Sequence, residues 1–182
     1  LLVINMNNLA SHMTMHRDTN EREQVDAISD DDEFAPMEGA PYAMTRATLL
    51  SPLGLPCSAP PWGVLAGVDL DSGRIVWRQT LGSTEDLAPG GLALKLGTPS
   101  FGGPMITAGG LIFIGAAMDD YIRAIDVDTG KELWKGRLPA GGQATPMSYV
   151  WKGRQYVVIA AGGHARIGSK LGDHIVAFAL PQ

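Results

Sequence analysis

Residues 65–77, LAGVDLDSGRIVW, and residues 122–134, IRAIDVDTGKELW, are two copies of one pattern. In each copy an apolar stretch leads into Asp-x-Asp-Ser/Thr-Gly, and a tryptophan stands four positions after the glycine. An aspartate side chain can accept hydrogen bonds from backbone N–H groups two residues further along, and glycine supplies the positive φ that a tight turn needs. Each copy therefore predicts two strands joined in a hairpin.

The two tryptophans of this pattern, Trp77 and Trp134, indicate how the hairpins are used. A hairpin that repeats with a tryptophan at a fixed position is typical of a β-propeller blade, in which the indole packs between neighbouring sheets. We therefore expect both side chains to be packing residues rather than platforms for a cofactor.

The last part of the chain contains a third, degenerate copy. Residues 173–178 match residues 120–125, and Ile159 matches Ile114. Because every copy consists of predicted strands and turns, the sequence predicts an all-β fold.

The repeats also predict how the chain is organised. Blade repeats lie near residues 64–82 and 111–138, and a last blade is expected at residues 156–180. Typical propellers have about four to eight blades, so these units alone cannot close a ring. We therefore interpret residues 1–182 as the C-terminal part of a larger propeller, or as an inactive product of a truncated gene. Residues 11–40 are polar and lack a clear period, which predicts a loop or insertion.

Charge and composition exclude several classes of protein. The formal net charge is −5, which argues against nucleic-acid binding because that needs a basic surface. No apolar stretch is long enough to span a bilayer, and the single cysteine, Cys57, excludes an internal disulfide. The acidic run at residues 30–33 lacks the EF-hand spacing, so a solvated loop is favoured over a calcium site.

The third copy carries an insertion that the fold does not require. Compared with the second copy it has eight extra residues, which fall within residues 162–172, GGHARIGSKLG. A blade needs only a tight turn there, so the added length indicates a function. Glycines let backbone N–H groups approach an anion closely, and the loop adds basic side chains that complement negative charge, His164, Arg166 and Lys170. The alternative is a flexible surface loop.

Three further stretches resemble a known family. Residues 136–147, GRLPAGGQATPM, residues 155–158, QYVV, and residues 161–164, AGGH, closely resemble the C-terminal end of membrane-bound quinoprotein glucose dehydrogenases. These belong to the glucose/quinate/shikimate group of PQQ-dependent dehydrogenases. The tryptophan repeats resemble the tryptophan-docking motifs of that superfamily. The resemblance covers roughly residues 41–181 and is weak before residue 41.

The resemblance implies an eight-bladed propeller with PQQ and a Ca²⁺ ion at its axis. It also implies oxidation of an aldose, D-glucose to gluconolactone, at the periplasmic face of the bacterial inner membrane, with electrons passing to ubiquinone. The family's catalytic aspartate, its calcium ligands and its membrane anchor are expected upstream, in the remainder of the same propeller and before it. We therefore assign no catalytic base and no metal ligand here, and we expect this segment alone to be inactive.

The resemblance carries over three cofactor-binding residues. His164 matches a family histidine near PQQ that influences substrate choice, and Asp119 matches an aspartate associated with the cofactor and metal region. Gly163 would offer its N–H to a PQQ carboxylate, by analogy with related alcohol dehydrogenases. The residues alone leave alternatives open, since His164 could be an ordinary loop residue and Asp119 could cap its own turn.

Two other functions compete with glucose oxidation. A quinate/shikimate or polyol dehydrogenase of the same group is the first, and a carboxylate substrate would call for an additional cation, for which Arg166 is a candidate. His164 favours a sugar. The second is a non-catalytic propeller that serves as an assembly scaffold, against which the long loop at residues 162–172 argues.

Overall fold

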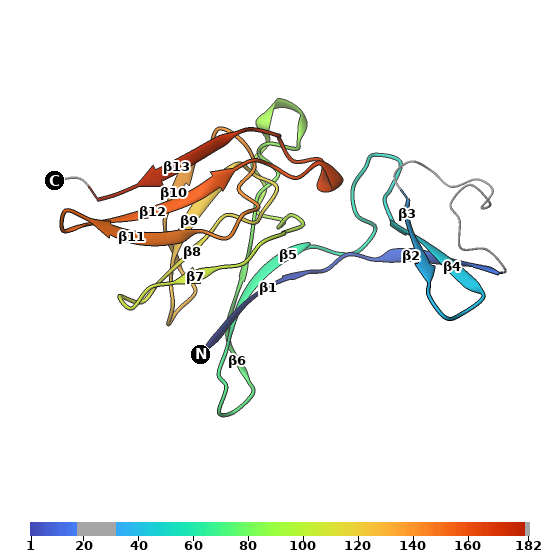
Figure 1. The fold of residues 1–182 in the computed structure, drawn as a ribbon, viewed down its shortest axis with the longest axis horizontal. Coiled ribbons are helices and arrows are strands. Elements are labelled where there is room, and N and C mark those ends of the chain that lie inside the picture. The colour runs from blue at the N-terminus through green and yellow to red at the C-terminus, as the bar shows by residue number, and fades with distance from the viewer. Residues whose placement is uncertain (18–31, 181–182) are drawn as a thin grey trace. The chain divides into compact units, whose positions relative to one another are not determined.

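The computed structural model of this protein describes residues 1–17 and 32–180 (Figure 1). The chain divides into two compact units, one formed by Leu1–Asn8 with Pro60–Gln182 and the other by Leu9–Ala59. Both units consist of antiparallel β-sheets, and the described ranges contain two 3-10 turns but no α-helix. The all-β prediction is confirmed. No helix in these ranges has the length and apolar character needed to cross a membrane.

The first unit contains three sheets that follow one another along the chain. The first has the order β1-β5-β6, the second β10-β9-β8-β7 and the third β11-β12-β13. Their strands are β1 (Leu2–Asn7), β5 (Gly63–Val68), β6 (Ile75–Thr80), β7 (Met105–Ile106), β8 (Leu111–Ile114), β9 (Tyr121–Asp126), β10 (Glu132–Arg137), β11 (Met147–Trp151), β12 (Arg154–Ala161) and β13 (His174–Phe178).

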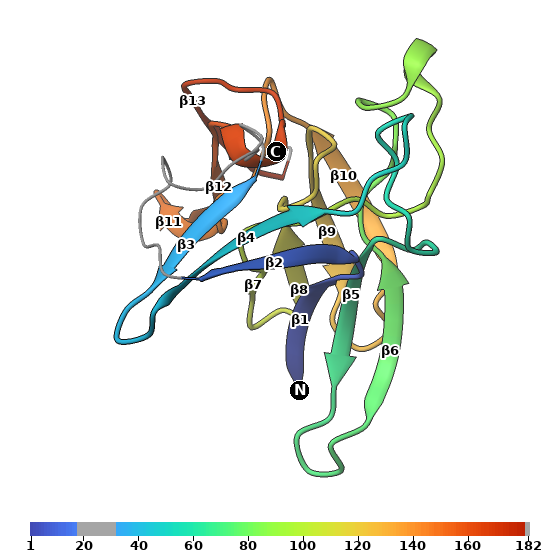
Figure 2. The same ribbon diagram turned by 90° about the vertical axis from the view of Figure 1, so that its right-hand side faces the viewer.

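The repeated turns have the geometry that the sequence predicts. Asp69 accepts hydrogen bonds at 2.7 Å from both the backbone N–H and the hydroxyl of Ser72, and Gly73 has φ +67°. In the second copy Asp126 binds Thr129 in the same way. These bonds close the β5–β6 hairpin and the β9–β10 hairpin. In Figure 2 the turn that joins β5 to β6 projects at the lower end of the view.

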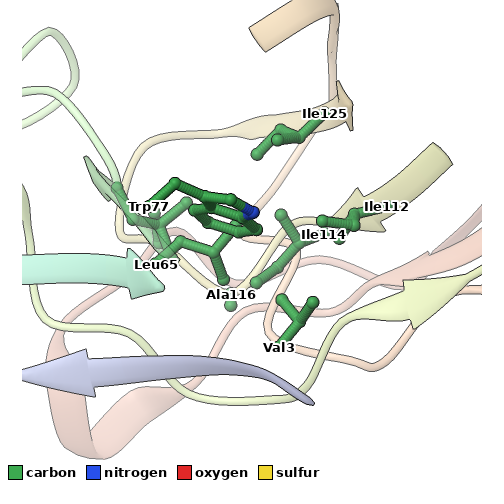
Figure 3. Packing of buried hydrophobic residues seen from close by; sticks show 9 residues of the cluster. Val3, Leu65, Trp77, Ile112, Ile114, Ala116 and Ile125 are labelled. Carbon is green, nitrogen blue, oxygen red and sulfur yellow. The ribbon is translucent and has the colours of Figure 1, made fainter. Parts of the chain in front are cut away.

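Trp77 joins the first sheet to the second. Its side chain is buried, and its Nε1–H donates a hydrogen bond of 2.8 Å to the carbonyl oxygen of Val127, in the β9–β10 turn. A Cβ at Gly130 would lie 2.5 Å from the indole, so only glycine lets the ring lie flat against this turn. Figure 3 shows the indole among Leu65, Ala116 and other apolar residues of the first core cluster.

Trp134 makes the corresponding contact between the second and third sheets. Its ring meets the ring of Phe178 edge to face, with centroids 5.2 Å apart. The strand β9 is buried on both faces as a result. Ile125 belongs to the cluster shared with the first sheet, and Ile122 belongs to the cluster shared with the third. Both tryptophans are packing residues, as expected.

The antiparallel order of the strands separates two kinds of connection. The short hairpin turns lie at one end of the sheets, at residues 69–74, 107–110, 127–131 and 152–153. The long connections leave the opposite end, at residues 81–104, 115–120, 138–146 and 162–173. Since loops carry most binding residues, this second end, which we call the loop end, is where a site is expected.

The second unit corrects part of the expectation that residues 11–40 form a loop or insertion, and residues 18–31 of this stretch lie outside the described residues. Instead of a loop, this stretch contains two strands of a sheet with order β2-β4-β3, formed by β2 (Ser11–Arg17), β3 (Glu33–Met37) and β4 (Tyr42–Thr48). Nearly all of β2 is exposed, so its ladder of bonds to β4 rather than apolar burial holds it in place. Met13 and Met15 alternate with polar residues in this strand, but both are exposed, so the alternation marks no buried face.

The acidic run falls partly in this sheet. Residues 30 and 31 lie outside the described residues, whereas Glu33 begins β3 and pairs with Arg46 of β4. Within the described residues, no group of three or more metal-binding side chains lies together.

Candidate functional site

Backbone hydrogen bonds join the long connections at the loop end. The N–H of Ala116 donates to the carbonyl oxygen of Gly142 at 2.7 Å. The N–H groups of Gly163 and Gly141 donate at 2.9 Å to the carbonyl oxygens of Gly141 and Lys170, respectively. The inserted loop is therefore fastened to the connection at residues 138–146.

The glycines of these segments allow close packing of one backbone against another. A Cβ at Gly163 would overlap the carbonyl oxygen of Lys170, and a Cβ at Gly102 would overlap that of Gln143. The N–H of Gly163 is engaged with Gly141, so the donation to a PQQ carboxylate expected from the sequence is not the bond that the structure shows. A contact between Gly163 and the cofactor stays a prediction.

His164 lies on the loop in a well-defined setting. Its ring stacks on that of Phe101, with centroids 5.2 Å apart and planes inclined by 28°. Its backbone N–H donates to the hydroxyl of Ser169 at 2.8 Å, and that hydroxyl donates to Gln143 Oε1 at 2.9 Å. Gln143 in turn donates to the carbonyl oxygen of Ala117 at 2.8 Å, so the chain of bonds runs from the loop to the connection between β8 and β9.

The imidazole has an unsatisfied atom. Nδ1 of His164 is buried and has no hydrogen-bond partner among the residues that the structure describes. A buried polar atom without a partner costs about 1–3 kcal/mol. A bound group that supplied a donor or acceptor at this atom would recover that energy.

Asp119 lies fully buried at the same end of the sheets. Its carboxylate accepts hydrogen bonds from Arg123 Nη1 at 2.9 Å, from the backbone N–H of Ser83 at 2.7 Å and from the Ser83 hydroxyl at 3.0 Å. It therefore fastens β9 to the connection that follows β6, rather than capping its own turn alone. Its association with a cofactor stays a prediction, and no contact joins it to His164 directly.

Asp120, which the sequence placed only in a turn, is a buried carboxylate at this end of the sheets. Its Oδ1 has no hydrogen-bond partner in the described part of the chain. It lines a cleft of about 190 Å³ together with Asp86, Arg137 and Lys170. Burial, and next the charge of Asp86, raises the pKa of Asp120, whereas the hydrogen bond from Arg137 lowers the pKa of Asp86.

The loop carries two further cations, of which Lys170 also lines the cleft beside Asp120. Arg166 lies in the 3-10 turn Ala165–Ile167, and both Arg166 and Lys170 are exposed. The loop end thus combines two exposed cations, Arg166 and Lys170, with the half-buried imidazole of His164, whose Nδ1 has no partner among the described residues. Glycines such as Gly163 pack the backbone of the loop closely against its neighbours. Such a surface suits a flat anionic ligand.

Comparison with known proteins identifies the fold family. The family model described as glucose/ethanol/alcohol dehydrogenase, beta-propeller domain, named PQQ, matches residues 1–157. The chain belongs to this PQQ family. The predicted propeller blades and the predicted likeness to quinoprotein glucose dehydrogenases are both confirmed.

Several curated proteins are similar to this member of the PQQ family. Quinoprotein glucose dehydrogenase A of Acinetobacter calcoaceticus is 48% identical over 91% of this chain and 21% of its own length. Quinoprotein glucose dehydrogenase of Escherichia coli is 49% identical over 81% of this chain and 19% of its own length. A probable quinate dehydrogenase (quinone) of Xanthomonas campestris is 47% identical over the same shares. The chain spans about a fifth of the length of these relatives.

Solved structures support the fold. Quinohemoprotein alcohol dehydrogenase from Comamonas testosteroni matches 97% of this chain and 23% of its own, with a TM-score of 0.58 and 21% identity. A europium-containing methanol dehydrogenase matches 88% of this chain and 23% of its own, with a TM-score of 0.52 and 24% identity. At these identities the likeness concerns the fold alone.

The residues at the loop end fit the family's cofactor. PQQ is a planar tricarboxylate, so it offers negative charge to Arg166 and Lys170 and polar atoms to the unsatisfied Nδ1 of His164.

Proposed function

We propose that this chain forms part of a quinoprotein dehydrogenase that oxidises an aldose, D-glucose to gluconolactone, with PQQ, and that passes the electrons to ubiquinone. The observation that carries the proposal is the buried, unsatisfied Nδ1 of His164 on a loop that bears accessible cations. The glucose dehydrogenases among the relatives support the choice of sugar.

The chain's own residues would act on the cofactor as follows. Arg166 and Lys170 would attract its carboxylates, and His164 would form a polar contact at Nδ1 and orient the ring system. The packed glycine backbone beneath them would exclude water from that side. PQQ, when bound, supplies the two-electron redox chemistry.

Ca²⁺ belongs to the proposal as a Lewis acid beside PQQ. No described residue of this chain is proposed as its ligand, because the resemblance implies ligands in the upstream part of the propeller. We also propose a location at the periplasmic face of the bacterial inner membrane, and the remainder of the same propeller as the chain's partner.

The test uses the full-length protein without its cofactor. Titration with PQQ should show binding, and His164→Ala should weaken the affinity for PQQ or raise the KM for glucose by about tenfold, which corresponds to about 1.4 kcal/mol. His174→Ala is the matched control, because His174 begins β13 directly after the same loop and its ring faces the exposed Asp173. Unchanged affinities in His164→Ala would refute the role of His164, and a wild type that binds no PQQ would favour the scaffold or an inactive product.

A second substrate class has support of its own. The quinate dehydrogenase relative is nearly as similar to this chain as the glucose dehydrogenases are. Quinate and shikimate carry a carboxylate, which the exposed Arg166 could pair with. A substrate panel with glucose, quinate, shikimate and glycerol decides between them. If Arg166→Gln lowered activity on quinate tenfold more than on glucose, the assignment would move to the quinate class.

A further inference from the structure

Phe101 is the one aromatic ring that the structure places against His164 among the described residues. Nδ1 of His164 has no partner, and the hydrogen bond to Ser169 fixes only its backbone. The orientation of the imidazole is therefore set by the face of Phe101 rather than by a hydrogen bond to the ring.

Phe101 itself stands on a segment that is fastened on several sides. Its N–H donates to the carbonyl oxygen of Ala116 at 3.0 Å. The preceding residue, Ser100, is buried and exchanges hydrogen bonds with Asn5 and Asn7 of β1 at 2.8–3.1 Å. The next residue, Gly102, has φ +91° and lies directly against the carbonyl of Gln143.

This anchoring has a consequence for the ring. A side chain on so fixed a backbone loses little further freedom when it stacks on a neighbour, so it can serve as a rigid support. Phe101 is 43% exposed, so this chain's own residues do not enclose its ring. The bonds at residues 100–102 therefore hold a partly exposed ring in one place.

We propose that Phe101 is a positioning residue that acts through His164. Its ring holds the imidazole in the orientation that brings Nδ1 to the cofactor. The proposal rests on the proposed PQQ site and adds to it the residue that orients its histidine. It predicts that Phe101 matters for cofactor binding only while His164 is present.

A double-mutant cycle in the full-length protein tests this dependence. Phe101→Leu should weaken PQQ binding by about two- to tenfold, the range expected for losing one aromatic pair. In the His164→Ala background the same change should have no further effect. Phe101→Tyr keeps the ring and should restore wild-type affinity. Equal losses in both backgrounds would overturn the proposal, because Phe101 would then act independently of His164.

A matched control separates positioning from general stability. Tyr149 and Tyr156 form another stacked pair with centroids 5.2 Å apart, and Tyr149 is 41% exposed, close to Phe101. Tyr149 lies in β11 and Tyr156 near the start of β12, whereas His164 follows the end of β12. Tyr149→Leu should leave PQQ affinity unchanged, and a loss equal to that of Phe101→Leu would contradict a specific role for Phe101.

A spectroscopic measurement keeps the two proposals apart. In histidine-labelled protein without cofactor, the ring-proton signals of His164 should shift in Phe101→Leu and return in Phe101→Tyr, because the neighbouring ring current is lost and restored. If the wild type bound no PQQ, the proposed function would fail while this shift still reported the contact. If the signals did not move, the positioning role would fail even with PQQ binding intact.

Discussion

Two carboxylates of one cleft differ in how the fold affects their protonation. Hydrogen bonding to Arg137 keeps the pKa of Asp86 low, while burial and then the charge of Asp86 keep the pKa of Asp120 high. A carboxyl group whose pKa is raised on folding stabilises the native state below its unfolded-state pKa, near 3.8, and loses that contribution as the pH rises. A carboxyl group with a lowered pKa contributes above that value and loses its contribution as the pH falls.

We expect the two asparagine variants to show opposite effects. In the full-length protein Asp120→Asn should raise the Tm at about pH 7, and the gain should shrink toward about pH 4, where the wild-type carboxyl becomes protonated. Asp86→Asn should lower the Tm at about pH 7, and this deficit should persist down to about pH 4 and shrink only below it, where the wild-type carboxylate becomes protonated. Thermal unfolding from about pH 7 to about pH 3 measures both. A gain in Asp86→Asn would contradict the assignment.

The conformation of the inserted loop depends more on Gly163 than on Gly168. Gly163 and Gly168 both have φ +69°, but a Cβ at Gly163 would overlap the Lys170 carbonyl, whereas a Cβ at Gly168 would meet nothing within 4 Å. We expect Gly168→Ala to cost about 1 kcal/mol through backbone strain alone. Gly163→Ala should cost more and should also weaken PQQ binding, because the loop must move away from Gly141. Chemical denaturation and PQQ titration of both variants check this, and equal losses would contradict it.

The tryptophans should differ in what they contribute to the stacked sheets. Trp77 is 8% exposed and Trp134 is 42% exposed. Trp77→Ala should therefore cost about 3–5 kcal/mol, as for other buried aromatic residues, and Trp134→Ala should cost less than half as much. Chemical denaturation of the full-length variants gives both free energies. A larger loss for Trp134→Ala would mean that the second contact, to Phe178, dominates.

At the scale of elements, the sequence predicted what depends on local chemistry. The Asp69 and Asp126 turns follow from side-chain bonds within three residues, and the tryptophan spacing indicated packing between sheets. The strand β2 was missed because its two apolar residues, Met13 and Met15, are exposed, so that its pairing with β4 rather than burial defines it. A period cannot report a strand that buries neither face.

At the scale of the whole molecule, the sequence predicted a candidate site but not its contacts. The loop length and the resemblance led to His164, which lies on the connection between β12 and β13, and its role at a PQQ site stays a prediction. The stacking of Phe101, 63 positions away, and the isolation of Asp120 Oδ1 arise only when separate connections meet. The hydrogen bond from the Gly163 N–H to the carbonyl oxygen of Gly141 also forms between two separate connections. The sequence alone therefore could not show that this N–H already has a partner.

The central claim is that the loop at residues 162–172 lines the site of a planar anionic cofactor. An experimental structure of the full-length protein loaded with PQQ tests it most directly. We predict that His164 Nδ1 lies within hydrogen-bond distance of a polar atom of PQQ, with Phe101 still stacked against the imidazole. PQQ bound elsewhere, with His164 contacting only protein or solvent, would contradict the account.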